Sequence, residues 1–228
     1  MKFGVSVFPG TWSDVDCYSV IDDVLGYEVE YVWHKETELD TYDCIIIPGG
    51  FSYGDYLRCG SIASLSPIMN SIKDFAQRGG LVIGICNGFQ ILVETELVPG
   101  VLLRNKYLEF ICKNVFVKIN NSENNYFKNI KKNTLELHIA HNEGNYFCSD
   151  DQMKKIEDNN QIALLYCNES GVVDEKINPN GSSKNIAGIF NKEKNILGMM
   201  PHPERMIDSY LSGVDGSIFF ENLINNLR

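Results

Sequence analysis

The chain has 228 residues, of which 44% are hydrophobic, and a formal net charge of −10. This length suits one α/β domain with a substantial core, which we place over residues 1–228. No uncharged apolar stretch approaches the roughly 20 residues of a membrane-spanning helix, and nucleic-acid recognition normally needs a basic patch. The composition therefore indicates a soluble globular protein whose partners are neither a membrane nor a nucleic acid.

The start of the chain and its cysteines bear on where the protein is located and on whether it has disulfides or a metal site. The segment from Met1 to Phe8 is apolar but short and runs straight into a loop, which predicts a buried first strand rather than a signal peptide. We therefore expect a cytoplasmic protein. The seven cysteines are scattered singly, without Cys-x-x-Cys spacing, and this predicts neither a disulfide framework nor a metal site.

Strand-like and helix-like segments alternate along the chain. Strands are predicted at residues 2–8, 28–33, 43–47, 81–85, 107–119, 134–140, 162–167, 186–190 and 196–200. Helices are predicted at residues 14–25, 61–78, 87–95, 150–158 and 215–227. The alternation in the first half predicts an α/β fold with an open, mostly parallel twisted sheet and helices on both faces. The region from about 100 to 140 predicts a smaller β-rich, partly hairpin-like insertion.

The segment Gly-Ile-Cys-Asn-Gly-Phe-Gln at residues 84–90 follows an apolar run and precedes a helix-permissive stretch. This is the pattern of a nucleophile elbow with cysteine in place of serine. The flanking glycines allow a sharp turn, so we expect Cys86 at a strand tip, facing the N-terminus of the next helix. Unpaired amides and the helix dipole favour a thiolate there. We predict that Cys86 is a nucleophile; the alternative is a small buried core residue.

A second segment, Pro-His-Pro-Glu-Arg at residues 201–205, also follows an apolar run. Pro203 favours an extended conformation at His202, and residues two apart in an extended chain point to the same side. His202 and Glu204 can therefore pair, which leaves the second imidazole nitrogen for a nucleophile, in the order Cys, His, Glu. A histidine between prolines can also be a rigid turn residue, but both segments at strand ends favour catalysis.

A third segment, Pro-Gly-Gly at residues 48–50, follows the predicted strand at 43–47. Ligands bind at the carboxyl ends of strands in an open parallel sheet, so all three segments are predicted at one edge. Unless this segment is only a glycine turn, the N–H groups of Gly50 and Asn87 supply an oxyanion hole. These parts indicate acyl transfer from an amide substrate through a thioester, and peptidase, esterase and amidase remain open on this argument.

These segments resemble the class I, or triad, glutamine amidotransferases, which have a flavodoxin-like fold. The strings Phe-Ser-Tyr-Gly-Asp at 51–55 and Met-Met-Pro-His-Pro-Glu-Arg at 199–205 are similar to the glutaminase subunits of phosphoribosylformylglycinamidine synthase. The similarity extends over essentially the whole chain. It implies hydrolysis of L-glutamine to L-glutamate and ammonia, with Cys86 as nucleophile, His202 as acid and base, and Glu204 as its orienting partner.

The same resemblance assigns residues around the substrate and identifies two departures from the family pattern. It implies an oxyanion hole from Gly50 and Asn87, and a glutamine pocket that includes Gly49, Gln90, Asn105 and Phe110. For Gln90, the alternative is an amide on the helix surface. The family's Asn-Cys-Asp string after Pro9-Gly10 is replaced by Thr-Trp-Ser-Asp at residues 11–14, and its His-Gly-Glu-Gly string is His-Asn-Glu-Gly at residues 141–144. For His141 and Glu143, a structural role in the loop is at least as well supported as catalysis.

The chain has neither a Gly-x-x-x-x-Gly-Lys-Ser/Thr loop nor a Gly-x-Gly-x-x-Gly string, so we expect no cofactor or metal in it. The reaction that the resemblance implies converts formylglycinamide ribonucleotide to formylglycinamidine ribonucleotide with ATP, in de novo purine biosynthesis. It implies a separate synthetase subunit, which binds ATP and magnesium and receives the ammonia directly, and a small bridging subunit. We expect docking to gate the glutaminase by completing its oxyanion hole.

Three alternatives of different classes remain from the sequence. The first is a glutaminase subunit that serves a different synthase. The second is a cysteine hydrolase of related fold, which would share the elbow without needing the His-Pro-Glu pair. The third is a catalytically silent glutamine-binding or scaffold subunit, against which the intact Cys86 argues.

Overall fold

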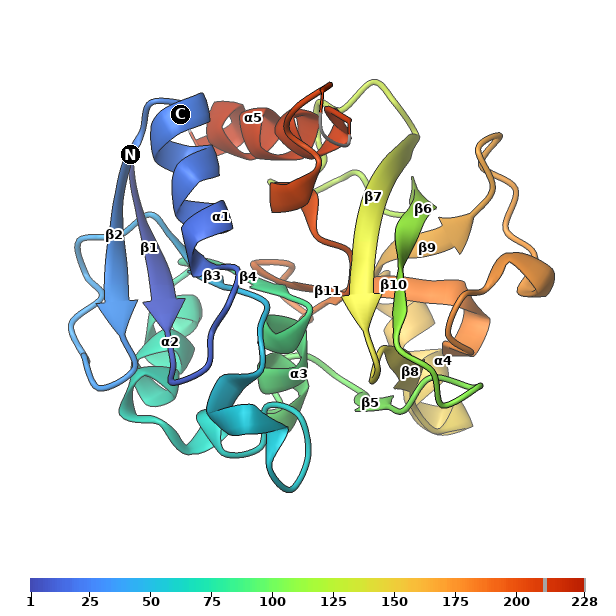
Figure 1. The fold of residues 1–228 in the computed structure, drawn as a ribbon, viewed down its shortest axis with the longest axis horizontal. Helices are drawn as coiled ribbons and strands as arrows, with labels where there is room; N and C mark the ends of the chain where they lie inside the picture. The colour runs from blue at the N-terminus through green and yellow to red at the C-terminus, as the bar shows by residue number, and fades with distance from the viewer. Residues whose placement is uncertain (211–212, 228) are drawn as a thin grey trace.

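The computed structural model describes residues 1–210 and 213–227 (Figure 1). Its strands are β1 (Lys2–Val7), β2 (Glu28–Trp33), β3 (Cys44–Ile47), β4 (Leu81–Ile85), β5 (Val101–Leu103), β6 (Ile111–Ile119), β7 (Thr134–His141), β8 (Asn145–Phe147), β9 (Ile162–Cys167), β10 (Ile186–Phe190) and β11 (Ile196–Met199). Its α-helices are α1 (Asp14–Ser19), α2 (Pro67–Gln77), α3 (Asn87–Glu94), α4 (Asp150–Asp158) and α5 (Asp215–Leu227).

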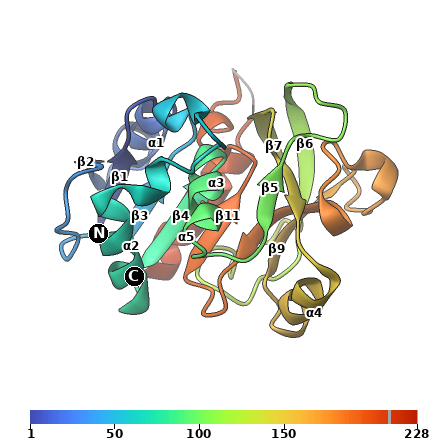
Figure 2. The same ribbon diagram turned by 90° about the horizontal axis from the view of Figure 1, so that it is seen from below.

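Within these residues, the main sheet has the order β2-β1-β3-β4-β11-β10-β9-β6-β7, and β5 pairs with β8 in a separate ribbon. The first half, from β2 to β11, is parallel. Helices cover both of its faces, α1 and α5 on one and α2 and α3 on the other (Figures 1 and 2). Strands covered on both sides are apolar throughout, and β3 and β4 contain only buried residues. The predicted fold class is therefore confirmed.

The second half of the sheet, from β11 through β10, β9 and β6 to β7, is antiparallel. In β7 fully buried residues alternate with partly exposed ones, which is the pattern of an antiparallel strand with one face on the core. The β-rich region between about 100 and 140 therefore contributes β6 and β7 to the main sheet, whereas its β5 belongs to the small ribbon.

Two boundaries differ from the sequence prediction by more than one residue, and two strands were not predicted, each for a local reason. The strand predicted from residue 107 begins at Ile111, because the preceding residues turn: Leu108 N donates to Asn105 O at 2.8 Å. The helix predicted from residue 61 begins at Pro67, because proline holds Ser66 extended. The three-residue strands β5 and β8 were not predicted, since such short segments show no periodicity. The helix predicted at 14–25 is confirmed as α1 followed by a π-helical stretch, Val20–Val24.

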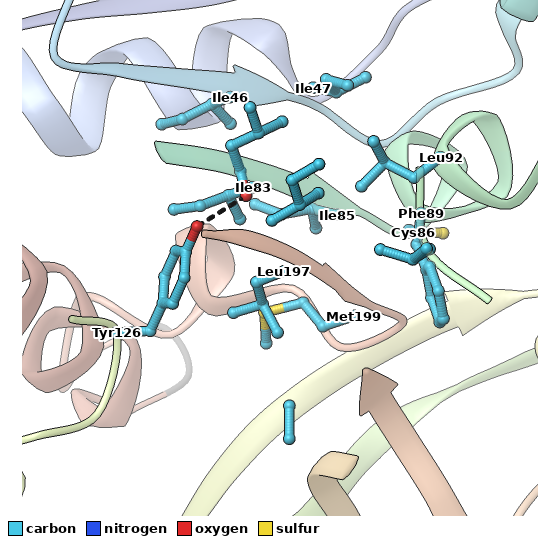
Figure 3. Close-up of a cluster of buried hydrophobic side chains, with 14 of the residues drawn as sticks. Ile46, Ile47, Ile83, Ile85, Cys86, Phe89, Leu92, Tyr126, Leu197 and Met199 are labelled. Atoms are coloured by element: carbon cyan, nitrogen blue, oxygen red, sulfur yellow. Dashed lines mark hydrogen bonds between the residues drawn. The ribbon is translucent and has the colours of Figure 1, made fainter. Parts of the chain in front are cut away.

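The core lies between the parallel strands and the helices that cover them. Figure 3 shows part of it, in which isoleucines of β3 and β4 pack with Phe89 and Leu92 of α3 and Leu197 of β11. The Tyr126 hydroxyl donates to Val82 O at 3.0 Å, so its one buried polar group is satisfied. This packing fixes the direction in which β4 enters α3. Among the described residues, no helix has the length and apolar character needed to cross a membrane.

Candidate active site

Cys86 lies in the turn between β4 and α3, as the elbow motif predicts. Its backbone has φ 51° and ψ −104°, a conformation that costs a non-glycine residue on the order of 1–3 kcal/mol. The turn is held on both sides: Cys86 N donates to Met199 O at 2.8 Å, and Cys86 O accepts from Gln90 N at 3.0 Å. Cys86 is 6% exposed and lies at the edge of the core cluster beside Phe89 (Figure 3).

His202 and Glu204 are paired directly and are both 2% exposed. His202 Nδ1 lies 2.5 Å from Glu204 Oε1, and since a carboxylate only accepts, Nδ1 carries the proton. The backbone N–H of His202 donates to His138 O of β7 at 2.7 Å. His202 Nε2 is buried without a hydrogen-bond partner in the described part of the chain, so this nitrogen is available for proton transfer.

Charge distribution around His202 favours the imidazolium form. Burial by itself lowers the pKa of His202, but interactions with Glu204 and Cys86 outweigh it and raise that pKa to about 10. The imidazolium is the state in which His202 can give a proton to a leaving amine.

Gly49 lies beside both Cys86 and the ring of His202. A Cβ atom on Gly49 would lie 2.7 Å from His202 Cε1 and 3.4 Å from Cys86 Cβ. The histidine ring and the cysteine therefore flank the same small volume, and only a residue without a side chain fits between them. The structure thus brings together Cys86, His202 and Glu204, which come from two distant parts of the sequence. The Cys86 Sγ atom faces Ala140 O of β7 at 3.7 Å.

Gly50 is supported by the loop that departs from the family pattern. Its φ is 147°, and a Cβ there would lie 2.5 Å from Trp12 N, so glycine is required. Gly50 forms a bridge with Thr11, and Trp12 N and Ser13 N both donate to Gly49 O, at 3.1 and 3.0 Å. The substituted residues 11–14 therefore pack directly against the predicted oxyanion donor.

The Asn87 side chain connects two loops at the first turn of α3. Asn87 Oδ1 accepts from Ser52 N at 3.0 Å, and Asn87 Nδ2 donates to Gln90 Oε1 at 2.9 Å. Gln90 Nε2 then donates to Glu143 O at 2.7 Å. Asn87 and Gln90 are 0% and 5% exposed, so Gln90 is not a surface amide. Sequence reasoning assigned only the backbone of Asn87; the signal for its side chain is a polar residue inside an otherwise apolar elbow.

Asn105 holds the loop at 141–144 through its amide. Asn105 Nδ2 donates to His141 O at 2.9 Å, and Oδ1 accepts from Gly144 N at 3.0 Å and contacts His141 Nδ1 at 3.0 Å. Burial, and then the charge of His202, lower the pKa of His141 to about 4. His141 is therefore neutral near His202 at physiological pH. Asn105 Nδ2 also donates to Glu109 O at 2.8 Å, so the side chain connects this loop to the residues just after it in its own segment.

Phe110 is placed apart from the triad. It is half exposed and lines a groove of about 1060 Å³ whose lining includes Asn105 but not Cys86, His202 or Glu204. Among the described residues, no group of three His, Cys, Asp or Glu side chains is arranged to hold a metal ion. The positions of Gly49, Gly50, Asn87 and Gln90 are consistent with a site around Cys86, whereas Phe110 opens onto a different surface.

The chain is similar to known proteins over its full length. A family model described as a CobB/CobQ-like glutamine amidotransferase domain matches residues 1–214. The chain is 66% identical over 228 residues to the phosphoribosylformylglycinamidine synthase subunit PurQ of Pelagibacter ubique (strain HTCC1062), and the match covers all of both chains.

Solved structures show the same similarity over the full length of the chain. The structure of PurLQS from Thermotoga maritima contains a chain with a TM-score of 0.88 and 38% identity, and the match covers 100% of this chain and 99% of that one. A glutamine amidotransferase from Thermotoga maritima has a TM-score of 0.57 and 15% identity, with coverage of 100% and 96%, and shows the shared fold alone. The chain therefore belongs to the glutamine amidotransferase family and, within it, to the PurQ subunits of phosphoribosylformylglycinamidine synthase.

Proposed function

We propose that this chain is the glutaminase subunit of phosphoribosylformylglycinamidine synthase. It hydrolyses L-glutamine to L-glutamate and ammonia, and the ammonia passes to a synthetase subunit that makes formylglycinamidine ribonucleotide with ATP in purine biosynthesis. The observation that supports this most directly is the position of Gly49 between Cys86 and the His202–Glu204 pair. Family membership supports glutamine as the substrate, and the geometry supports Cys86 as the nucleophile with His202 as its acid and base.

The proposed reaction has two steps at Cys86. Its thiolate attacks the side-chain amide carbon of glutamine, and the N–H groups of Gly50 and Asn87 stabilise the oxyanion, each such donor being worth roughly 10²–10³ in turnover. His202 Nε2 gives its proton to the leaving ammonia, and a thioester forms. His202 then takes a proton from water, the hydroxide attacks the thioester, and glutamate leaves as the thiol is restored. Glu204 remains ionised and holds Nδ1–H throughout.

The remaining predicted site residues receive roles that fit their contacts. We propose that Gly49 provides the space in which the scissile amide meets the sulfur. Gln90 borders the substrate on the α3 side while it holds Glu143 O. Asn105 acts through the loop at 141–144, which it fixes, and Phe110 contacts a ligand only if the groove at Asn105 opens toward Cys86.

The chain functions as one part of a complex. By similarity to PurLQS of Thermotoga maritima, its partners are a synthetase subunit and a small bridging subunit. We propose that ATP and magnesium bind to the synthetase, and that this chain works without a cofactor, in the cytoplasm. We also propose that residues 1–228 form one domain; residues 211, 212 and 228 of it lie outside those that the structure describes.

The site is closed in this structure, which supports gating by the partner. Cys86 is 6% and His202 is 2% exposed, and the sulfur faces a backbone carbonyl of β7. Glutamine therefore needs a movement of the surrounding loops before it reaches the sulfur. We propose that docking to the synthetase produces this movement and completes the oxyanion hole. The isolated chain should then have weak glutaminase activity, and full activity without a partner would contradict the gating.

The test compares two cysteine variants in the assembled complex. Cys86→Ala should abolish glutamine-dependent product while synthesis from added ammonium continues, because the synthetase is unchanged. Cys112→Ser, the matched control at an exposed cysteine, should leave both activities intact. A cysteine-alkylating glutamine analogue should label Cys86, as mass spectrometry of peptides would show. Retained glutamine use in Cys86→Ala, or loss of ammonia use, would refute the assignment.

A further inference from the structure

A second cysteine–histidine pair lies on the antiparallel half of the sheet. Cys112 Sγ lies 3.5 Å from His138 Nε2, and His138 Nδ1 lies 2.9 Å from Asn114 Oδ1. Asn114 is opposite His138 in the register of β6 and β7, and Cys112, two residues along β6, shares its face. Cys112 is the one exposed cysteine of the seven. A thiol, an imidazole and an amide are thus in contact, outside the glutaminase triad.

The contacts around Asn114 determine the protonation of His138. Asn114 Nδ2 donates to Glu136 Oε1 at 3.2 Å, and a carboxylate only accepts, so this contact fixes the orientation of the amide. Asn114 Oδ1 therefore faces His138 Nδ1 and accepts a hydrogen bond from Nδ1–H. The neutral imidazole then carries its lone pair on Nε2, which faces the Cys112 thiol. This is the tautomer that a general base for the thiol requires.

The charges around His138 keep it neutral. Burial lowers the pKa of His138, the charges of His202 and Arg205 lower it further, and Glu204 opposes them. A histidine whose pKa lies below its usual value is unprotonated at physiological pH and available as a base. His138 therefore differs from His202, whose interactions with Glu204 and Cys86 favour the protonated form.

Cys112 opens onto the groove of about 1060 Å³ between residues 105–113 and 175–185. The lining of this groove does not include Cys86, His202 or Glu204. Its charged lining residues are Lys106, Glu109, Lys113, Glu175, Lys176 and Lys184. Lys184 pairs with Glu157, and the three other lysines still outnumber the two carboxylates of the lining, whereas the whole chain has a net charge of −10. A small anion is therefore attracted to the groove that Cys112 lines.

We propose that Cys112 is a second nucleophilic thiol, assisted by His138, which exchanges with negatively charged low-molecular-weight disulfides. The Cys112 thiol gives its proton to His138 Nε2, and the thiolate attacks one sulfur of the disulfide. The S–S bond of the reagent breaks as a new S–S bond forms to Cys112, and the departing thiolate takes the proton from His138. One disulfide replaces another, so no further oxidant is needed. This site does not depend on the glutaminase activity.

The test measures mixed-disulfide formation at Cys112 of the full chain with glutathione disulfide, by intact-mass and peptide mass spectrometry at pH 7. His138→Gln should slow the reaction about 10-fold, because the thiol loses the base that takes its proton as it attacks. Asn114→Ala should slow it less, since it loosens the tautomer but keeps the base. All variants should react equally fast when unfolded in urea, and Cys112→Ser should form no adduct at this position. Equal rates for folded wild type and His138→Gln would overturn the proposal.

The charge of the reagent provides an independent measurement on the wild-type chain. At low salt, glutathione disulfide should react faster than neutral 2-hydroxyethyl disulfide, and cationic cystamine should react slowest. The three rates should converge at about 1 M salt, because the screening length shrinks to roughly 3 Å. Cystamine reacting as fast as glutathione disulfide at low salt would contradict the role of the groove.

Discussion

The two cysteine–histidine pairs of this chain differ in burial and in the third residue, which contacts the histidine. At Cys86 the histidine is paired with a buried carboxylate, and its pKa is raised to about 10. At Cys112 the histidine contacts an exposed amide, and its pKa is lowered. The carboxylate stabilises an imidazolium, whereas the amide only selects a tautomer. The residue that contacts the histidine, together with burial, therefore determines whether the histidine rests as an imidazolium or as a neutral base.

Replacing Glu204, the residue that pairs with His202, should have the largest effect on turnover. Glu204→Gln gives His202 an amide partner, so its pKa falls and the imidazolium loses its stabilising charge. Glutamine-dependent turnover of the complex should drop about 10³–10⁴-fold, as it does when other triads lose this carboxylate. Ammonia-dependent synthesis is the internal control and should not change. Turnover within a few-fold of wild type would show that Glu204 does not have this role.

The next largest effect on turnover should come from a substitution that crowds the buried pair of Cys86 and His202. Gly49→Ala places a Cβ 2.7 Å from His202 Cε1, so the ring must move away from Cys86. A displacement of about 1 Å typically costs on the order of 10² in turnover, which stopped-flow or coupled assays of the complex would measure. Gly79→Ala is the control: its φ of 93° strains the backbone, which Gly49→Ala does not, but nothing lies within 4 Å of the new Cβ. If Gly79→Ala loses as much turnover as Gly49→Ala, general destabilisation rather than the contact with the His202 ring is responsible.

The contributions of His202 and His138 to the free energy of unfolding should change with pH in opposite directions. The folded pKa of His202, about 10, lies above the roughly 6.5 of an unfolded histidine. Its contribution to the free energy of unfolding is therefore complete below pH 6.5 and is lost as pH rises toward 10. For His138 the folded pKa is lowered, so its contribution is complete above pH 6.5 and is lost as pH falls.

Calorimetric melting from pH 5 to 10 would check this. The difference between wild type and His202→Gln should shrink on the alkaline side, and the difference between wild type and His138→Gln should shrink on the acid side. Parallel melting curves for wild type and His202→Gln between pH 7 and 10 would contradict the raised pKa.

The smallest expected effect comes from giving the exposed pair a carboxylate. Asn114→Asp should raise the pKa of His138 and make it a stronger base toward the Cys112 thiol, so the exchange rate of Cys112 with a disulfide at pH 7 should rise a few-fold. The gain is limited because exposed charges interact weakly in water. A slower reaction would mean that the amide does more than select the tautomer.

The sequence predicted those parts of the fold that depend on local pattern. Apolar runs ended by glycine or proline predicted β3, β4 and β11, whose carboxyl ends bring Cys86 and His202 to one edge. Side-chain direction and register are not local. The Asn87–Gln90 connection and the Asn105 contacts with residues 141–144 depend on how loops pack. The Cys112–His138 contact depends on the register of β6 and β7, so singly scattered cysteines gave no sign of it.

The position of β7 has a consequence for control of the enzyme. β7 is the last strand of the sheet, yet its carbonyls contact both Cys86 Sγ and the backbone of His202. An edge strand presents backbone N–H and C=O groups with which a strand of another protein can pair. A partner that pairs with this edge and displaces β7 would therefore move its contacts with Cys86 and His202 together.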